Sequence, residues 1–235
     1  MMLPVAILAG GLATRLRPIT ETIPKALIQI AGEPFIFHQL RYLHQQGVAS
    51  VVLCIGYLGE MIQDIVGNGS QFGVQVSYSF DGPKLLGTGG AIKAAIPLLG
   101  NNFFIFYGDS YLPIDFKSVA KAYFLSNKLG LMTVLKNENQ WDKSNVIYQN
   151  DSLIEYNKEE TKPHMNYIDY GLGILNSGVF NTYPTEESFD LSKVYNHLSL
   201  NKQLYGFEVF ERFYEIGSHQ GILETEEYLI SREKK

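Results

Sequence analysis

Short apolar runs alternate with helix-like segments in the part of this chain that precedes Asp109. Residues 4–9, 51–55 and 103–107 are apolar almost throughout, which is typical of strands buried on both faces of a parallel sheet. Residues 74–80 alternate between apolar and polar side chains and predict one more strand. Apolar residues at helical spacing predict helices over three segments, at residues 34–47, 58–66 and 89–99. This alternation predicts βαβ units around a parallel sheet.

The second half of the chain is more polar, and its expected strands are shorter. Those strands are predicted at residues 131–135, 146–149, 153–156 and 167–175, with polar connectors at 137–143 and 157–165. Residues 218–235 predict a closing helix capped by Ser218. We therefore expect an α/β fold in which a Rossmann-like, mixed but mostly parallel sheet is flanked by helices, with a small lobe added by the second half.

The composition of the chain argues against some classes of binding partner. The chain has 235 residues, of which 46% are hydrophobic, and a formal net charge of −5. Nucleic acids and membrane surfaces both attract basic patches, so we expect neither as a partner. The single cysteine, Cys54, lies in an apolar run; we expect it to be buried, and it has no partner for an internal disulfide. No apolar run reaches the roughly 18 residues of a membrane span, and the basic start of a signal peptide is missing, so we expect a cytoplasmic protein.

A glycine turn directly follows the first expected strand, at Gly10 and Gly11. Glycines in this position let the backbone approach a ligand closely and direct N–H groups at phosphate oxygens. Arg15 and Lys25 follow within the same stretch and add two cations. Asp109 comes directly after another strand, so it is expected at the same edge of the sheet. A Gly-Asp pair after a strand is also a common way to cap a helix, and that alternative stays open for Asp109.

The longest motif is the string GGLATRLRP at residues 10–18, followed by PK at residues 24–25. Three shorter strings follow, namely LGTGGA at 86–91, YGD at 107–109 and FYEIGS at 213–218. Together these segments resemble the motifs of the sugar-nucleotide pyrophosphorylases, which are sugar-1-phosphate nucleotidyltransferases. The resemblance covers nearly the full chain. It is strongest to short single-domain members, such as the heptose 1-phosphate and mannose 1-phosphate guanylyltransferases and the uridylyltransferase for N-acetylmuramate 1-phosphate.

The resemblance implies an enzyme that joins a nucleoside triphosphate to a sugar 1-phosphate, releases pyrophosphate and uses Mg²⁺. A heptose or a hexose is the expected sugar. The whole chain, residues 1–235, would be a single domain with a nucleotide-binding half at 1–112 and a sugar-binding half at 113–235. The nucleotide base and the oligomeric state, monomer or homodimer, stay open.

The resemblance also implies a role for individual residues. The expected catalytic residues are Arg15, Lys25 and Asp109, and the expected magnesium ligands are Asp109 and Glu215. The nucleotide would contact Leu8, Ala9, Gly10, Gly11, Thr14, Arg15, Gly87 and Thr88. The sugar phosphate would contact Gly108, Asn157, Lys158, Asp169 and Gly171.

The chain departs from the family pattern at three places. Most relatives have an aspartate where this chain has Glu215, and a Glu-Lys pair where it has Asn157 and Lys158. Asp169 and Gly171 stand where relatives have an Asn-Ala-Gly segment. Glutamate remains a hard oxygen ligand, so a magnesium site is still expected. Lys158 is followed by two glutamates, and a solvated surface residue is the alternative to its role at the sugar phosphate.

Three other functions remain as alternatives. A regulatory protein could bind a nucleotide sugar without catalysis, although it would not need Arg15, Lys25, Asp109 and a late carboxylate together. A cytidylyltransferase could act on a non-sugar phosphate such as phosphocholine. A glycosyltransferase would usually have an Asp-x-Asp motif, whereas here Tyr111 stands where the second aspartate belongs. The five histidines show no metal-ligand spacing and are expected to be structural or exposed.

Overall fold

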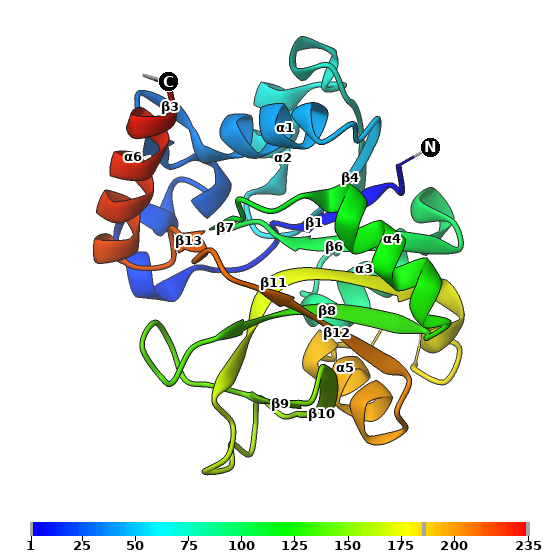
Figure 1. Cartoon of the computed structure of the whole chain (residues 1–235). Coiled ribbons are helices and arrows are strands. Elements are labelled where there is room, and N and C mark those ends of the chain that lie inside the picture. The colour runs from blue at the N-terminus through cyan, green and yellow to red at the C-terminus, as the bar shows by residue number, and fades with distance from the viewer. Residues whose placement is uncertain (1, 185–186, 234–235) are drawn as a thin grey trace.

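The computed structural model describes residues 2–184 and 187–233 of the chain. One side of its main sheet, as far as the edge strand, consists of four strands from the first half (Figure 1). In spatial order these are β6 (Asn102–Tyr107), β1 (Val5–Leu8), β4 (Ser50–Ile55) and β5 (Gln75–Phe80), and all three pairings between them are parallel. Both faces of β1, β4 and β6 are buried, which explains why their sequences are almost entirely apolar. The three strands predicted from apolar runs and the one predicted from alternation are confirmed.

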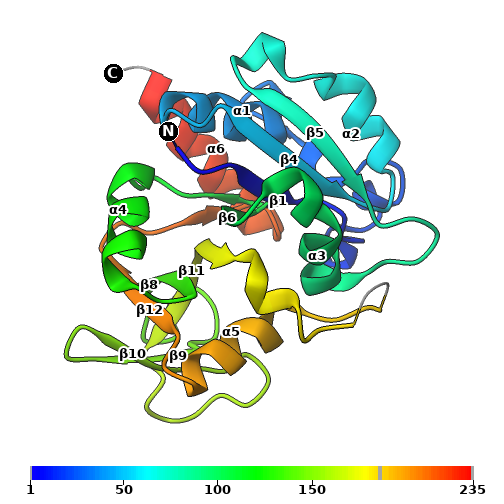
Figure 2. The same ribbon diagram turned by 90° about the vertical axis from the view of Figure 1, so that its right-hand side faces the viewer.

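Successive residues of β1 pack against helices on opposite sides of the sheet. Val5 and Ile7 belong to the core that contains α1 (Phe35–Gln45), α2 (Gly59–Val66), α4 (Phe116–Ser126) and α6 (His219–Glu233). Ala6 belongs to a second core with α3 (Gly87–Leu99) and α5 (Leu191–Leu200). The two sets of helices therefore cover the two faces of the sheet, as Figure 2 shows in side view. Cys54 lies in the second core and is buried, as predicted.

The second half extends this sheet through antiparallel strands. β11 (Tyr167–Asn176) pairs antiparallel with β6, β8 (Gly130–Lys136) pairs antiparallel with β11, and β12 (Leu204–Val209) runs parallel to β8. The hairpin of β9 (Val146–Gln149) and β10 (Ser152–Tyr156) lies beside the beginning of β11. With α5 it forms the small lobe at the bottom of Figure 1. The predicted Rossmann-like fold, with its mixed sheet and added lobe, is confirmed.

Several boundaries and elements differ from the prediction. The helix predicted at residues 89–99 begins two residues earlier, at Gly87. Neither α4 and α5 nor β12 was predicted. The closing helix is confirmed from His219 to Glu233, while residues 234–235 of that prediction lie outside the described part of the chain. Its predicted cap is also confirmed, because the hydroxyl of Ser218 accepts a hydrogen bond from the Gly221 N–H at 3.0 Å.

Two short strand pairs and several 3₁₀ turns complete the fold. β7 (Ser110–Tyr111) pairs antiparallel with β13 (Tyr214–Glu215), and β2 (Gln29–Ile30) pairs with β3 (Glu33–Pro34). The 3₁₀ turns are Thr14–Leu16, Ile19–Glu21, Lys25–Leu27, Ser70–Phe72 and Ser177–Phe180. Within residues 2–184 and 187–233, none of the helices combines the length and the apolar character that crossing a membrane requires.

Candidate active site

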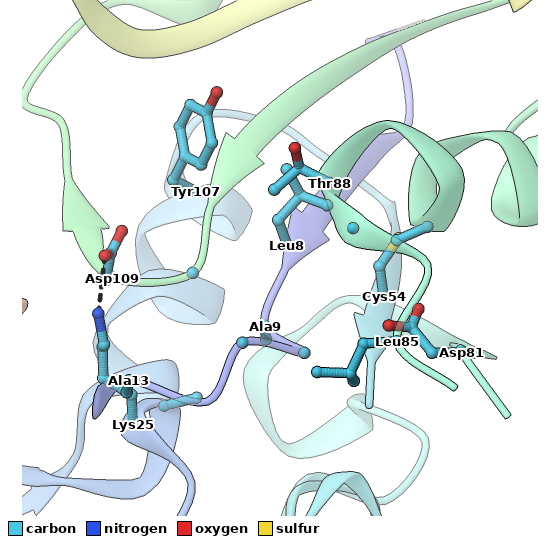
Figure 3. Close-up of a pocket in the computed structure, with 16 residues that line it drawn as sticks. Leu8, Ala9, Ala13, Lys25, Cys54, Asp81, Leu85, Thr88, Tyr107 and Asp109 are labelled. Carbon is cyan, nitrogen blue, oxygen red and sulfur yellow. Dashed lines mark hydrogen bonds and ion pairs between the residues drawn. The ribbon is translucent and has the colours of Figure 1, made fainter. Parts of the chain in front are cut away.

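A cavity of about 240 Å³ lies at the carboxyl ends of β1 and β6 (Figure 3). Ligands of open α/β sheets bind at this edge. The cavity is lined by Leu8, Ala9, Gly10, Gly11, Ala13, Lys25, Ala26, Cys54, Asp81, Leu85, Gly87, Thr88, Ala91, Tyr107, Gly108 and Asp109. The structure thus brings together most of the residues expected to contact the nucleotide, together with Lys25, Gly108 and Asp109. In the close-up, Lys25 and Asp109 lie on one side and Asp81 on the other.

Close backbone packing requires two glycines of this cavity, Gly10 and Gly108. A Cβ atom on Gly10 would lie 2.9 Å from the backbone nitrogen of Gly56, and one on Gly108 would lie 2.5 Å from the carbonyl oxygen of Leu8. By contrast, a Cβ on Gly11 would meet nothing within 4 Å. Gly10 and Gly108 therefore let neighbouring segments pack closely, while Gly11 leaves the mouth of the cavity open to a ligand.

The LGTGGA segment forms the beginning of α3 and connects the two halves of the chain. Gly87 has a φ of +69°, and a Cβ there would lie 2.7 Å from the carbonyl oxygen of Phe189. That same carbonyl accepts a hydrogen bond from the Gly89 N–H at 2.9 Å. The Thr88 hydroxyl accepts a hydrogen bond from the Leu191 N–H at 2.8 Å, at the beginning of α5. Residues at this wall of the cavity are therefore fixed by contacts with the second half.

Lys25 and Asp109 form an ion pair inside the cavity. The Lys25 Nζ lies 3.0 Å from the Asp109 Oδ2, and the side chains are 19% and 32% exposed. The hydroxyl of Ser110 donates to the other carboxylate oxygen of Asp109 at 3.3 Å. Asp109 is not the cap of a helix, because β7 follows it directly. The pair therefore places one cation and one anion beside the glycine turn, where phosphate groups and a divalent metal could meet.

Glu215 lies on the strand next to the one that follows Asp109. The register of β7 and β13 sets Glu215 opposite Ser110, and the Ile216 N–H donates to the carbonyl oxygen of Asp109 at 2.9 Å. The carboxylate of Glu215 accepts hydrogen bonds from the Gly217 N–H and, at 2.8 Å, from the Ser218 hydroxyl. Glu215 does not line the cavity, but its backbone position is tied to that of Asp109.

The donor set fits a magnesium ion only in part. Mg²⁺ prefers oxygen ligands and is often held by one or two carboxylates together with substrate phosphates and waters. Asp109, directly before β7, and Glu215, on its partner strand β13, supply two carboxylates. In the described residues, no group of three or more histidine, cysteine, aspartate or glutamate side chains could hold a metal ion. The arrangement therefore suits an ion that completes its coordination with substrate oxygens, and does not suit a metal bound by protein alone.

Thr14 and Arg15 lie outside the lining of the cavity, in the 3₁₀ turn Thr14–Leu16. The turn is entered through Ala13, which has a left-handed φ of 48°. The Arg15 side chain is exposed and reaches Gly217, since a Cβ on that glycine would lie 3.1 Å from the Arg15 Nη2 and 2.5 Å from the Glu215 Oε2. Gly217 therefore leaves room for Arg15 and Glu215 to approach the same point.

A second polar group, from the other half of the chain, includes Asp169 on β11. Burial raises the pKa of Asp169 to about 6, even though the Gly171 N–H donates to its carboxylate and the charge of Lys158 opposes the rise. The Lys158 Nζ lies 4.0 Å from the Asp190 Oδ2. Lys158 therefore forms a long ion pair with Asp190 at the surface, and its side chain is 58% exposed.

Tyr107 connects this second group to the cavity. Its side chain lines the cavity, and burial, followed by the charge of Asp169, raises its pKa well above the ordinary value. Gly171 has a φ of +105°, and a Cβ there would lie 3.6 Å from the Tyr107 ring. The side chain of Asn157, in contrast, accepts hydrogen bonds from the N–H groups of residues 159 and 160 and holds its own turn.

Two carboxylates in these surroundings were not predicted. Asp81 follows β5 directly and lines the cavity; its Oδ2 accepts a hydrogen bond from the Leu86 N–H at 3.2 Å, and burial raises its pKa. Its position after a parallel strand was the available signal. Asp190 lies beside Lys158 and caps α5 by accepting from the Ser192 N–H. Nothing local in the sequence distinguishes Asp190 from an ordinary helix cap.

Comparisons with known proteins agree with this geometry. The sequence profile described as nucleotidyl transferase matches residues 5–232. A D-glycero-alpha-D-manno-heptose 1-phosphate guanylyltransferase from Aneurinibacillus thermoaerophilus is 32% identical over 213 residues, which cover 90% of this chain and 91% of that protein. The protein of the same name from Campylobacter jejuni is 30% identical over 189 residues, covering 80% and 82%.

Solved structures give the same result. The chain is similar to HddC from Yersinia pseudotuberculosis complexed with GMP-PN, with a TM-score of 0.80 and 26% identity over 97% of this chain and 100% of that one. It shares its fold with a putative glucose-1-phosphate thymidylyltransferase from Bacillus anthracis, with a TM-score of 0.84 and 20% identity over 96% and 94%. The similar proteins are sugar-1-phosphate nucleotidyltransferases, and this chain belongs to the nucleotidyl transferase family.

Proposed function

We propose that this protein condenses a nucleoside triphosphate with a sugar 1-phosphate to give a nucleoside diphosphate sugar and pyrophosphate. The observation that supports this most directly is the Lys25–Asp109 pair, which faces the glycine turn within one cavity. The neighbouring group of Lys158, Asp169 and Asp190 offers a place for the sugar phosphate on the side of Tyr107.

The reaction needs charge neutralisation more than proton transfer. A phosphate monoester has a second pKa of about 6, so a sugar 1-phosphate is already largely dianionic at neutral pH and needs no general base. The difficulty is that an anion must approach the α-phosphorus of a polyanion. Lys25 and the N–H groups of Gly10 and Gly11 are placed to neutralise triphosphate oxygens, and Arg15 lies at the outer side of the same edge.

The bonds change in a single displacement. An oxygen of the sugar phosphate forms a bond to the α-phosphorus while the bond from that phosphorus to the oxygen bridging to the β-phosphorus breaks, and the electron pair leaves with pyrophosphate. Asp109 and Glu215 would hold Mg²⁺, which would neutralise phosphate charge when bound. The chain's own residues would position the two substrates in line, with Arg15 at the departing pyrophosphate, Lys25 at the reacting phosphates and Lys158 at the sugar phosphate.

The sugar is proposed to be a heptose or a hexose. Carboxylates accept hydrogen bonds from sugar hydroxyls, and Asp169 and Asp190 supply two of them beside Lys158. The relatives named for heptose 1-phosphate and mannose 1-phosphate support the same substrates. Because nucleoside triphosphates are its proposed substrates, we place the protein in the cytoplasm.

The base is proposed to be guanine. One oxygen of the Asp81 carboxylate accepts a hydrogen bond from the Leu86 N–H, and its remaining lone pairs can accept donors from a ligand. The edge of guanine presents two adjacent donors, N1–H and the N2 amino group. Adenine, uracil and thymine present an acceptor next to their donor, which a carboxylate would repel. The relatives named guanylyltransferases point in the same direction.

A panel of pyrophosphate-release assays tests the proposal. The common nucleoside triphosphates would each be combined with several sugar 1-phosphates and with phosphocholine, in the presence of Mg²⁺. We expect release with GTP and a heptose or hexose 1-phosphate. Release only with CTP and phosphocholine would establish the non-sugar alternative. Tight binding of a nucleotide sugar without release from any pair would establish a regulatory protein instead.

A further inference from the structure

Gln39, in the middle of α1, is in contact with the turn that contains Asp109. The side chain is fully buried, with 0% exposure. Its Nε2 group donates two hydrogen bonds, to the carbonyl oxygen of Tyr107 at 3.1 Å and to that of Ser110 at 2.7 Å. These two carbonyls belong to the residues immediately before and after Gly108–Asp109. The amide therefore connects the two ends of the turn from the side of α1.

The oxygen of the same amide shows that Gln39 does more than fill space. Gln39 Oε1 is buried and has no hydrogen-bond partner among the described residues. An unpartnered buried acceptor destabilises a fold, and an apolar side chain of similar size would avoid that cost. The reversed amide is excluded as well, because it would set Oε1 against two carbonyl oxygens. A glutamine here is useful only through its two Nε2 bonds.

Two backbone hydrogen bonds also hold the turn that contains Asp109. The Gly108 N–H donates to the carbonyl oxygen of Leu8 at 2.9 Å, and the Ile216 N–H donates to the carbonyl oxygen of Asp109 at 2.9 Å. Those contacts fix the turn to β1 on one side and to the segment after Glu215 on the other. Gln39 adds a contact from α1. Unlike the two backbone hydrogen bonds, this contact comes from a side chain, so a substitution can remove it without changing the backbone.

We propose that Gln39 is a positioning residue that sets the direction of the Asp109 carboxylate relative to Lys25 and Glu215. This inference rests on the proposed function, since it gives Gln39 a role in holding the metal ion that the reaction uses. Residues that orient a ligand from behind commonly change metal affinity or activity by about 10–100-fold when they are removed. The chemical class served is a divalent cation bound together with the phosphates of a nucleotide.

The test uses Gln39→Leu in the full chain, with Gln45→Leu as its matched control. Gln45 lies on the same helix and is exposed, so the control makes the same chemical change away from the turn. Gln39→Met, which is unbranched and also lacks N–H donors, serves if the leucine variant does not fold. Three quantities would be measured: Mn²⁺ binding by electron paramagnetic resonance in the presence of the nucleoside triphosphate, the steady-state constants for pyrophosphate release, and the thermal midpoint.

For Gln39→Leu we expect Mn²⁺ affinity and kcat to fall by about 10–100-fold. We expect KM for the triphosphate to change less than about threefold and the far-ultraviolet spectrum to stay that of the wild type, because triphosphate binding also uses the glycine turn. Gln45→Leu should match the wild type throughout. Wild-type Mn²⁺ affinity and kcat in both Gln39 variants would overturn the inference, as would a loss of activity matched by an equal unfolded fraction. Failure of the wild type to release pyrophosphate would refute the proposed function separately.

Discussion

The Nζ of Lys25 lies 3.0 Å from the Oδ2 of Asp109, although 84 positions separate the two residues in the sequence. Lys25 begins a 3₁₀ turn after the glycine loop, and Asp109 follows the neighbouring parallel strand, β6. The parallel pairing of β1 with β6 brings their carboxyl ends to one edge and makes this contact possible. The ion pair is thus a product of the sheet topology, and it sets the charge beside the glycine turn.

Replacement of this lysine is the first prediction. Lys25→Met should lower kcat by about 100–1000-fold, the usual effect of removing one group that stabilises charge in a transition state. Its effect on stability should be about 1 kcal/mol or less, because the pair is partly exposed. Lys121→Met, an exposed change on α4, is the control. Steady-state kinetics and thermal unfolding test the two expectations. A Lys25→Met variant with the kcat of the wild type would show that Lys25 has no role in the mechanism.

The second prediction concerns the role of Asp109 in binding the metal ion, which the substitution Asp109→Asn tests. The amide keeps the shape of the side chain but loses the charge that binds a divalent cation, so Mg²⁺-dependent pyrophosphate release should be abolished while the fold remains. The equivalent change at an exposed position of α2, Asp64→Asn, should have no effect. Titration of activity with Mg²⁺, alongside circular dichroism, gives the answer. A folded and fully active Asp109→Asn protein would contradict the metal role.

Asp81→Asn should change which base is accepted. An asparagine presents one donor and one acceptor, which disfavours the two donors of guanine and matches xanthine, where a carbonyl replaces the N2 amino group. We expect kcat/KM to fall for GTP and to rise for xanthosine triphosphate, each by about 10-fold or more, since each good or lost base contact is worth about 1–3 kcal/mol. If the ratio between the two nucleotides does not change, Asp81 does not read the base.

The raised pKa of Asp169 predicts how stability depends on pH. Its carboxyl group has a pKa of about 6 in the folded protein and about 4 when unfolded, so the folded state holds the proton more tightly. The contribution of Asp169 to the free energy of unfolding is therefore greatest below about pH 4. It is lost as the pH rises through 6, and the loss is at most about 3 kcal/mol. Asp169→Asn keeps an acceptor for the Gly171 N–H and removes this loss. Urea unfolding at pH 4.5 and 7.5 should show the variant gaining on the wild type at the higher pH; equal differences at both values would refute the assignment.

Sequence alone predicts the strands of the first half because burial on both faces forces them to be apolar. It misses β12, where Gly206 interrupts the pattern; a Cβ there would lie 2.8 Å from the Tyr148 ring, so this strand depends on packing against a distant hairpin. α5 is missed for a similar reason. Its beginning at Asp190 is held by the Thr88 hydroxyl bonded to the Leu191 N–H, a contact between the two halves that no local pattern contains.

The residues of the candidate site also fall into those that the sequence predicts and those that it does not. The glycine turn, Lys25 and Asp109 could be predicted because a motif and the end of a strand both identify them. Asp81 also follows a strand, but a lone carboxylate there has no meaning until the cavity around it is known. Gln39 could not be predicted, because its function depends on two backbone carbonyls that are about 70 positions away in the chain.

The most direct measurement is the stereochemical course at the α-phosphorus. A chirally defined nucleoside 5′-(α-thio)triphosphate would be turned over with the sugar 1-phosphate accepted in the assay panel, and the configuration of the nucleotide sugar would be determined by ³¹P nuclear magnetic resonance. A single in-line displacement at the cavity of Lys25 and Asp109 predicts inversion. Retention of configuration, which requires two displacements and a covalent enzyme intermediate, would contradict it.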